Sequence, residues 1–351
     1  MPDLSIGSYI IGFQQPAFII AEIAQSHDGS LGLAHAYIDA AAEAEANAVK
    51  FQTHIADQES TYDEPFRVKF SLQDDTRYAY WKRMEFTAEQ WKGLACHAAD
   101  QNLVFLSSAF SLQAVELLER IGVSAWKVGS GEFRSTDLLD GMVQTGKPIL
   151  VSTGMSNWPE IDAIAHYFQQ RQHPFGLFQC TSMYPTPSES VGLNVVEQMR
   201  KRYECPIGLS DHSGKPFAGL AALARGIDLI EVHLTFDKRM FGPDVSASLT
   251  IEDLKLLTTA RTEFAAMDAH PVDKDDMAQH LNAMRELFTK SVAPTRALKA
   301  GEVLAPSMLM AKKPGTGIPY AELDRLVGQR LQRDVSADRL LTWEDMGVEH
   351  A

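Results

Sequence analysis

Two histidines, His212 in GLSDHS and His233 in EVHLT, are the residues of this sequence best suited to metal chemistry. Each ends a short apolar run, and the two runs are consecutive along the chain. Neighbouring strands lie about 4.8 Å apart, so both imidazoles could bind one divalent metal and leave positions open for water or substrate. The alternative is that the two histidines are hydrogen-bonded residues that line a polar pocket. The spacing is compatible with a metal site and with this alternative.

Two lysines, Lys50 and Lys127, also come late in apolar runs, where a buried ammonium group is costly unless an anion lies beside it. Phosphate is a natural partner, and hydroxyl groups at other run ends would help to bind it. These hydroxyls belong to Ser108, Ser130, Ser152 and Thr153. One alternative is a structural ion pair with Glu22 or Glu132. Another is that one lysine is a Schiff-base nucleophile, as in barrel aldolases.

Four more residues could serve such a site. Glu22, at the end of the first run, could act as a general base or hold a water molecule. Glu132 could orient a lysine or bind a sugar hydroxyl. Tyr184 and Asp244 follow later runs and, taken alone, are more typical of loops than of ligand contacts.

The elements that must position these residues are short apolar runs alternating with segments of helical spacing. The runs are 18–24, 48–53, 103–110, 125–132, 148–155, 175–182, 205–212 and 229–235. This alternation is typical of parallel strands buried on both faces, and eight such units in about 250 residues predict a (β/α)₈ (TIM) barrel. An open doubly wound sheet is the rival, although no GxGxxG follows the first run. The polar run ends would meet at one mouth of a barrel.

The pattern changes after residue 250. We predict a barrel over 1–270, a polar linker over 271–289, and a compact module of short strands and turns over 290–351. The chain of 351 residues has 32 Lys and Arg against 46 Asp and Glu, and its net charge of −14 argues against nucleic acid or anionic membrane as a partner. Without an apolar run of about 18 residues or a signal peptide, we expect a cytoplasmic protein. Three cysteines without a CxxC pair predict neither disulfides nor a zinc site.

The motifs together resemble the N-acetylneuraminate (sialic acid) synthase family, which includes spore-coat polysaccharide biosynthesis relatives. The matching segments are FIIAEIAQSHDGSLG, AEANAVKFQTH, FLSSAF, WKVGSGE, ILVSTGM, QCTSMYPTP, IGLSDHS, IEVHLTFDKRMFGPDVSAS and AKKPGTGI. The C-terminal part resembles the antifreeze-like (SAF, β-clip) module of these enzymes. The resemblance implies a synthase that condenses phosphoenolpyruvate with an open-chain N-acyl hexosamine, such as N-acetylmannosamine, for surface polysaccharide biosynthesis. The products would be a sialic-acid-like nonulosonic acid and phosphate.

The resemblance also implies roles for individual residues. His212 and His233 match ligands of a divalent metal, Mn²⁺ first, with Mg²⁺ or Co²⁺ as alternatives. Glu22 matches the acid that handles water. The positions that hold phosphoenolpyruvate match Lys50, Ser108, Lys127, Ser130, Ser152, Thr153 and Ser210. The positions around the sugar match Gln52, Tyr184 and Asp244, and Ser182 stands where some members have asparagine. The family further implies a domain-swapped homodimer in which the module of one subunit caps the barrel of the other.

The sequence departs from the family at two motifs. The usual EIGxNHNG is EIAQSHDG here, with Ala24, Ser26 and Asp28 as replacements. The usual KRPG is KKPG, so Lys313 stands where an arginine contacts the acyl sugar, and lysine lacks the two-pronged donor geometry of a guanidinium group. We therefore expect the phosphoenolpyruvate and metal sites to be intact, and either a preferred sugar that differs from N-acetylmannosamine or use of N-acetylmannosamine with a high KM. A non-catalytic sugar-binding protein remains a further alternative.

Overall fold

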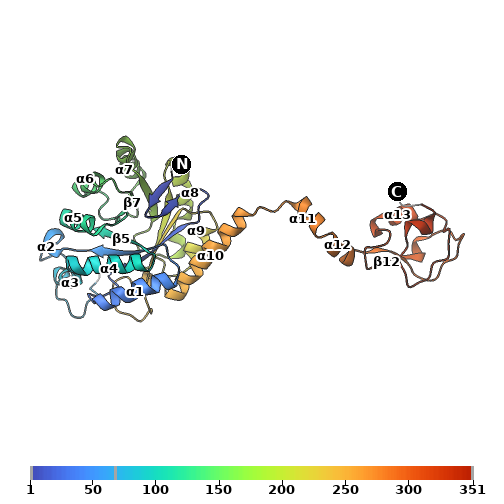
Figure 1. Ribbon diagram of the computed structural model, residues 1–351, viewed down its shortest axis with the longest axis horizontal. Coiled ribbons are helices and arrows are strands. Elements are labelled where there is room, and N and C mark those ends of the chain that lie inside the picture. The colour runs from blue at the N-terminus through green and yellow to red at the C-terminus, as the bar shows by residue number, and fades with distance from the viewer. Residues whose placement is uncertain (1–2, 67–68, 349–351) are drawn as a thin grey trace. The chain divides into compact units, whose positions relative to one another are not determined.

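Eight parallel strands form a closed barrel in the computed structural model, which describes residues 3–66 and 69–348 (Figure 1). Around the barrel the strand order is β10-β3-β4-β5-β6-β7-β8-β9. The strands are β3 (Phe18–Ala24), β4 (Ala48–Thr53), β5 (Val104–Ala109), β6 (Trp126–Val128), β7 (Ile149–Ser152), β8 (Phe175–Cys180), β9 (Ile207–Asp211) and β10 (Leu229–His233). Each predicted run contains one of them, and the predicted (β/α)₈ barrel is confirmed.

An outer layer of helices surrounds these strands (Figure 1). It consists of α1 (Leu31–Glu43), α4 (Ala88–Asp100), α5 (Leu112–Ile121), α6 (Thr136–Gln144), α7 (Trp158–Gln170), α8 (Leu193–Arg202), α9 (Phe217–Leu223) and α10 (Ile251–Ala269). Local sequence fixes where several helices begin, because Ser30, Thr87, Ser111 and Asn157 each accept a hydrogen bond from a backbone N–H of the first turn. None of the described helices combines the length and the hydrophobicity needed to cross a membrane.

A hairpin that the sequence analysis did not predict closes the N-terminal end of the barrel. It pairs β1 (Leu4–Ile6) with β2 (Tyr9–Ile11). Its buried residues Leu4, Ile6 and Ile11 join one apolar cluster with interior residues of the strands, such as Leu150 and Phe178. This half of the interior is therefore filled by hydrocarbon, and polar side chains are confined to the opposite end.

Strand β3 is irregular at the end that carries the site. Its pairing with β4 shifts register between Glu22 and Ala24, and Ala24 has a φ of +47°. This left-handed conformation costs an L-residue about 1–2 kcal/mol and suits glycine, which is the family residue that Ala24 replaces.

A long excursion separates β4 from α4. It contains α2 (Ala56–Glu59) and α3 (Arg77–Met84), and the other loops of the barrel carry the short helices η1 (Ser188–Ser190) and η2 (Val245–Ala247). In α3, Tyr80 and Met84 are buried while Arg77 and Trp81 line a cavity at the mouth of the barrel. The excursion therefore supplies a wall of that cavity.

The chain divides into two compact units, Met1–Ala269 and His270–Ala351. The second unit begins with α11 (Lys274–His280) and α12 (Asn282–Phe288), so the segment predicted as a linker is largely helical. Strands β11 (Ser291–Pro294) and β12 (Leu309–Lys312) then pair antiparallel. The remaining elements are η3 (Pro306–Met308), η4 (Tyr320–Glu322), α13 (Leu323–Leu326) and η5 (Trp343–Met346). Val292, Ile318 and Leu341 belong to an apolar core confined to this unit.

We expect a protein that ends at Ala269 to fold by itself, because both apolar clusters of the barrel contain residues of the first unit only. Circular dichroism should show one cooperative thermal transition, with the full-length protein as the control. Calorimetry should show nearly unchanged affinity for phosphoenolpyruvate, whose expected ligands all lie in the barrel. A truncated protein that melts without cooperativity would contradict this.

Candidate active site

The strand register brings the predicted residues to one end of the barrel. In the strand register, Glu22 of β3 is opposite His233 of β10 on one side and Lys50 of β4 on the other. Ser108 is level with Gln52 and with the neighbouring Lys127. Since alternate residues of a strand share a face, side chains at these levels can converge inside the barrel.

A cavity of about 590 Å³ lies at this end. Thirteen of the predicted site residues line it: Glu22, Lys50, Gln52, Ser108, Lys127, Ser130, Glu132, Ser152, Ser182, Tyr184, Ser210, His212 and His233. Asp244 lines a neighbouring cavity of about 440 Å³, which Gln52, Tyr184 and His233 also line. Most residues predicted to bind the two substrates are thus gathered around two adjoining cavities.

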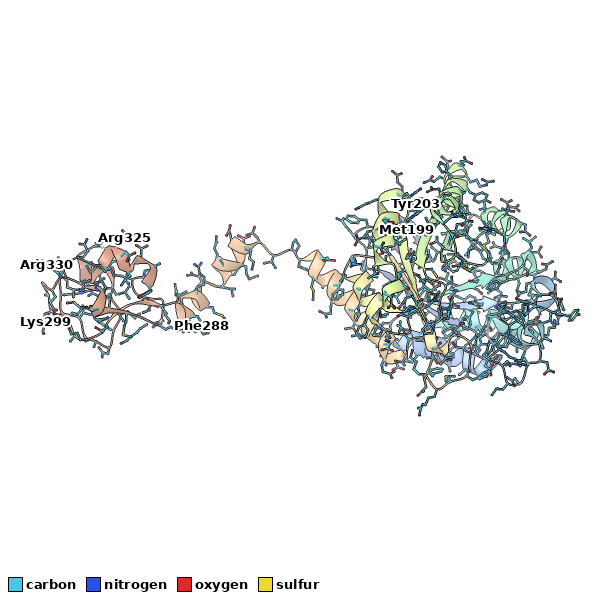
Figure 2. The ribbon with its side chains drawn as sticks, turned by 180° about the vertical axis from the view of Figure 1, so that it is seen from behind. Met199, Tyr203, Phe288, Lys299, Arg325 and Arg330 are labelled. Carbon is cyan, nitrogen blue, oxygen red and sulfur yellow. The ribbon has the colours of Figure 1, made fainter. Side chains whose placement is uncertain are left out.

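Two predicted residues are not among those that line either cavity. The Thr153 hydroxyl donates a hydrogen bond to the carbonyl of Phe178 at 2.9 Å, and its backbone N–H donates to the same oxygen at 3.1 Å. The Thr153 hydroxyl therefore links the end of β7 to β8, and its predicted ligand contact stays a prediction. Lys313 belongs to the second unit, where its ammonium group lies 5.0 Å from the ring centroid of Phe288, at the end of α12 (Figure 2).

Four charged side chains meet at the bottom of the larger cavity, and each is at most 5% exposed. Lys50 pairs with Glu22 and lies 3.8 Å from Glu231, and Lys127 lies 3.2 Å from Glu231. The sequence analysis missed Glu231. The signal was present, because Glu231 stands two residues before His233 on β10 and must share its inward face. Glu132, the predicted alternative partner, instead accepts a hydrogen bond from Ser135.

The two glutamates differ in protonation. Burial raises the pKa of Glu22 to about 8, despite the opposing charge of Lys50. Burial acts the same way on Glu231, but the charges of Lys127 and Lys50 outweigh it and lower this pKa to about 2. Burial lowers the pKa of Lys50, and the glutamates raise it by more. At pH 7 Glu22 is therefore mainly neutral, so the two lysines face one carboxylate and the group suits an anion.

Hydroxyl groups extend this anion site. Lys50 donates to the Ser108 hydroxyl at 3.2 Å, and Lys127 donates to that of Ser152 at 2.6 Å. Ser130 accepts a hydrogen bond from the backbone N–H of Gly154 at 3.0 Å. A Cβ at Gly154 would lie 2.5 Å from the Ser182 hydroxyl and 2.9 Å from that of Ser130. Glycine is therefore required for these two serines to stand side by side at the cavity.

The two histidines fit a metal-binding role in their chemistry. Burial lowers the pKa of His212 to about 4 and that of His233 well below its usual value, so both are neutral imidazoles at pH 7. Their ring centroids lie 5.2 Å apart. His212 Nδ1 lies 3.1 Å from the Thr181 carbonyl, which leaves Nε2 as the nitrogen with a lone pair, and buried Nδ1 of His233 has no hydrogen-bond partner. No group of three or more metal-type side chains occurs among the described residues, so two ligands would come from the chain.

We expect Lys127→Met to weaken phosphoenolpyruvate binding strongly, because the excess positive charge is removed. The change also leaves Lys50, at 3.8 Å, as the remaining lysine beside Glu231. Loss of one partner of a buried pair costs about 3–5 kcal/mol of unfolding free energy. The double variant Lys127→Met/Glu231→Gln should regain much of this stability in chemical denaturation, but not the affinity measured by calorimetry. Unaltered affinity in the single variant would contradict the assignment.

The raised pKa of Glu22 predicts how anion binding depends on pH. The carboxyl group is neutral at pH 7 and becomes negative as the pH rises through about 8. We therefore expect the affinity of the metal-free protein for phosphoenolpyruvate, measured by calorimetry, to fall from pH 7 to pH 9. Glu22→Gln cannot ionise, and its affinity should change little over this range. An equal fall in both proteins would show that another group is responsible.

Comparisons with known proteins find relatives of this chain along most of its length. A model of the NeuB family matches residues 37–271, and a model of the SAF domain matches residues 289–346. An N,N'-diacetyllegionaminic acid synthase from Campylobacter jejuni is 30% identical over 329 residues, which is 92% of this chain and 98% of that protein. The spore coat polysaccharide biosynthesis protein SpsE from Bacillus subtilis is 29% identical and covers 99% of this chain and 98% of its own length.

A solved structure of a similar protein leads to the same family. The N-acetylneuraminic acid (sialic acid) synthetase from Leptospira borgpetersenii, crystallised with citrate, has a TM-score of 0.70 and 29% identity. The match covers 81% of this chain and 98% of that one. The resemblance inferred from the motifs is thereby confirmed, and the relatives include proteins named as a legionaminic acid synthase and a sialic acid synthetase. Because the first family model covers more than half of the sequence, this chain belongs to the NeuB family and carries a C-terminal SAF domain.

Proposed function

We propose that this protein condenses phosphoenolpyruvate with an open-chain N-acyl hexosamine to give a nonulosonic acid and phosphate. The observation that carries the proposal is the excess positive charge of Lys50 and Lys127 at the bottom of a cavity that two neutral histidines also line. An anion would bind at the lysines, beside Ser108 and Ser152. The sugar would lie nearer the mouth, between the two cavities.

In this proposal Glu22 serves first as an acid and then as a base. The methylene carbon of phosphoenolpyruvate forms a bond to the aldehyde carbon, and protonated Glu22 gives its proton to the former carbonyl oxygen. Water then adds to the second carbon of the phosphoenolpyruvate unit and returns a proton to Glu22. The bond between that carbon and the phosphate oxygen breaks, a ketone forms, and phosphate leaves with the remaining hydroxyl proton. The buried position of Glu22 keeps bulk water from competing for this proton.

His212 and His233 would hold a divalent metal, with Mn²⁺ as the first candidate and Mg²⁺ or Co²⁺ as alternatives. Imidazole ligands suit a transition metal better than a hard cation such as Ca²⁺. When bound, the metal would supply a Lewis acid for the aldehyde oxygen. Ser210, which donates to Glu231 at 3.0 Å and lies 3.4 Å from Nε2 of His212, links the histidines to the charged group.

The acceptor sugar and the assembly are part of the same proposal. Gln52, Tyr184 and Asp244 would contact the sugar, and we propose that Lys313 of a swapped homodimer completes its site. N-acetylmannosamine and diacylamino sugars are both candidate acceptors, since one relative is named as an N,N'-diacetyllegionaminic acid synthase. A role in cytoplasmic synthesis of a surface polysaccharide precursor follows from the resemblance and stays a prediction.

The barrel aldolase alternative is less consistent with the structure. A Schiff base requires an unprotonated amine, whereas Lys50 is held between two glutamates that raise its pKa. Lys127 is likewise paired with Glu231 and bound to Ser152. Borohydride added with pyruvate should therefore trap no adduct, and covalent labelling of either lysine would favour the alternative. Phosphate release would exclude a non-catalytic sugar-binding role.

Phosphate release tests the proposed function and its metal. The full-length protein should release phosphate from phosphoenolpyruvate only when an open-chain N-acyl hexosamine is present, and the panel should include N-acetylmannosamine and a diacetamido-trideoxy hexose. Chelation with EDTA should abolish release, and Mn²⁺ should restore it more fully than Ca²⁺. Full activity in EDTA would refute the metal, and no release with any sugar would refute the function.

A further inference from the structure

His54 lies between two aromatic rings in the wall of the larger cavity. Its imidazole is nearly parallel to the ring of Phe110, with centroids 4.3 Å apart and 9° between planes, and to that of Trp81, at 3.9 Å and 16°. All three residues line the cavity, and His54 is 5% exposed. Rings packed on both faces prevent the imidazole from turning out of its plane, so only its edge can make polar contacts.

Both ring nitrogens of His54 contact side chains in that plane. Nδ1 pairs with a carboxylate oxygen of Glu59, whose second oxygen accepts a hydrogen bond from the Ile55 backbone N–H at 3.3 Å. Nε2 lies 3.4 Å from the amide oxygen of Gln52, and Gln25 donates to the same oxygen at 3.4 Å. The Gln52 amide is therefore held from two sides, and its remaining polar edge is available to the cavities that Gln52 lines.

The stack is supported from α3. The Trp81 indole N–H donates to Glu64 at 3.2 Å, and the Arg77 guanidinium group lies 5.1 Å from the Trp81 ring centroid. Arg77 also pairs with Glu64 at 3.3 Å. The excursion between β4 and α4 thus fixes the position of Trp81 against His54, which immediately follows β4.

We propose that His54 is a positioning residue: it fixes the Gln52 amide and thereby sets the affinity for the acceptor sugar. This inference rests on the proposed function, in which Gln52 contacts the sugar. The hydrogen-bond partners of His54 are Glu59 and Gln52, and neither belongs to the buried charged group that would hold phosphoenolpyruvate. The effect of His54 is therefore confined to the acceptor.

Two substitutions of His54 separate its packing from its polar contacts. His54→Phe keeps a flat ring between Phe110 and Trp81 and removes both nitrogens. His54→Gln can retain a polar group near the position of Nε2 and reach Gln52. Loss of a hydrogen bond that orients a ligand group corresponds to a rise of about threefold to tenfold in KM. We expect that rise for the sugar in His54→Phe, a smaller one in His54→Gln, and a KM for phosphoenolpyruvate within about twofold of wild type in both. His166→Phe on the exposed side of α7 is the matched control.

A double-mutant cycle tests whether His54 acts through Gln52. Phosphate release should give a KM for the sugar in His54→Phe/Gln52→Ala no higher than in Gln52→Ala alone, since Gln52 is then absent. Additive effects, an unchanged KM in His54→Phe, or an equal change for phosphoenolpyruvate would overturn the inference. Melting temperatures check folding, and His54→Gln alone suffices if the phenylalanine variant does not fold. If the wild-type protein releases phosphate, these outcomes bear on the role of His54 alone. If the wild-type protein is inactive, both the role of His54 and the proposed function are refuted.

Discussion

The balance of charge inside the closed barrel is the constraint on which the rest of this structure depends. Four ionisable side chains are buried there, and an unpaired buried charge would cost several kcal/mol. Glu231 lies between Lys50 and Lys127 and stays ionised, while Glu22 becomes neutral. The result is a single excess positive charge in a place from which water is largely excluded. A site of this kind binds an anion strongly, because the negative charge of the anion neutralises the excess positive charge of the buried side chains.

The barrel interior is divided into an apolar end and a polar end, and this division follows from the same constraint. At the N-terminal end, hairpin residues and strand residues such as Leu150 and Phe178 form one apolar cluster. At the other end the strands finish in lysine, glutamate, serine and histidine. Hydrocarbon packing at one end supplies stability, so the other end can hold polar groups whose burial is unfavourable. The backbone is left-handed at Ala24, and Gly154 lacks the Cβ that would crowd the hydroxyls of Ser130 and Ser182.

The excursion after β4 gives the site its outer wall. Trp81 of α3 is fixed by stacking on His54 and by its hydrogen bond to Glu64, and Arg77 of α3 pairs with the same glutamate, so the order of the strands extends to this helix. Rigid side chains at the mouth matter because a flexible sugar loses less affinity when the groups that bind it are already in place. In the proposed function, a deep site for the anion and an outer site for the sugar would thus depend on different interactions, charge balance in one and stacking in the other.

Sequence alone determined the barrel, its eight strands and about half of the residues that line the larger cavity. The physical reason is that parallel strands buried on both faces must be apolar along their length, and polar residues at their ends mark the mouth. The predicted ligand contact of Thr153 stays a prediction, because its hydroxyl bonds to the neighbouring strand and a hydroxyl at a strand end can serve either a strand or a ligand. Glu231 was not predicted, because it lies within a strand and the prediction considered residues at the ends of the apolar runs. Only the tertiary structure decided which carboxylate faces which lysine, and hence that Glu22 is neutral and Glu231 charged. Those states depend on distances of 3–4 Å between side chains from different strands, which chain order and spacing do not specify.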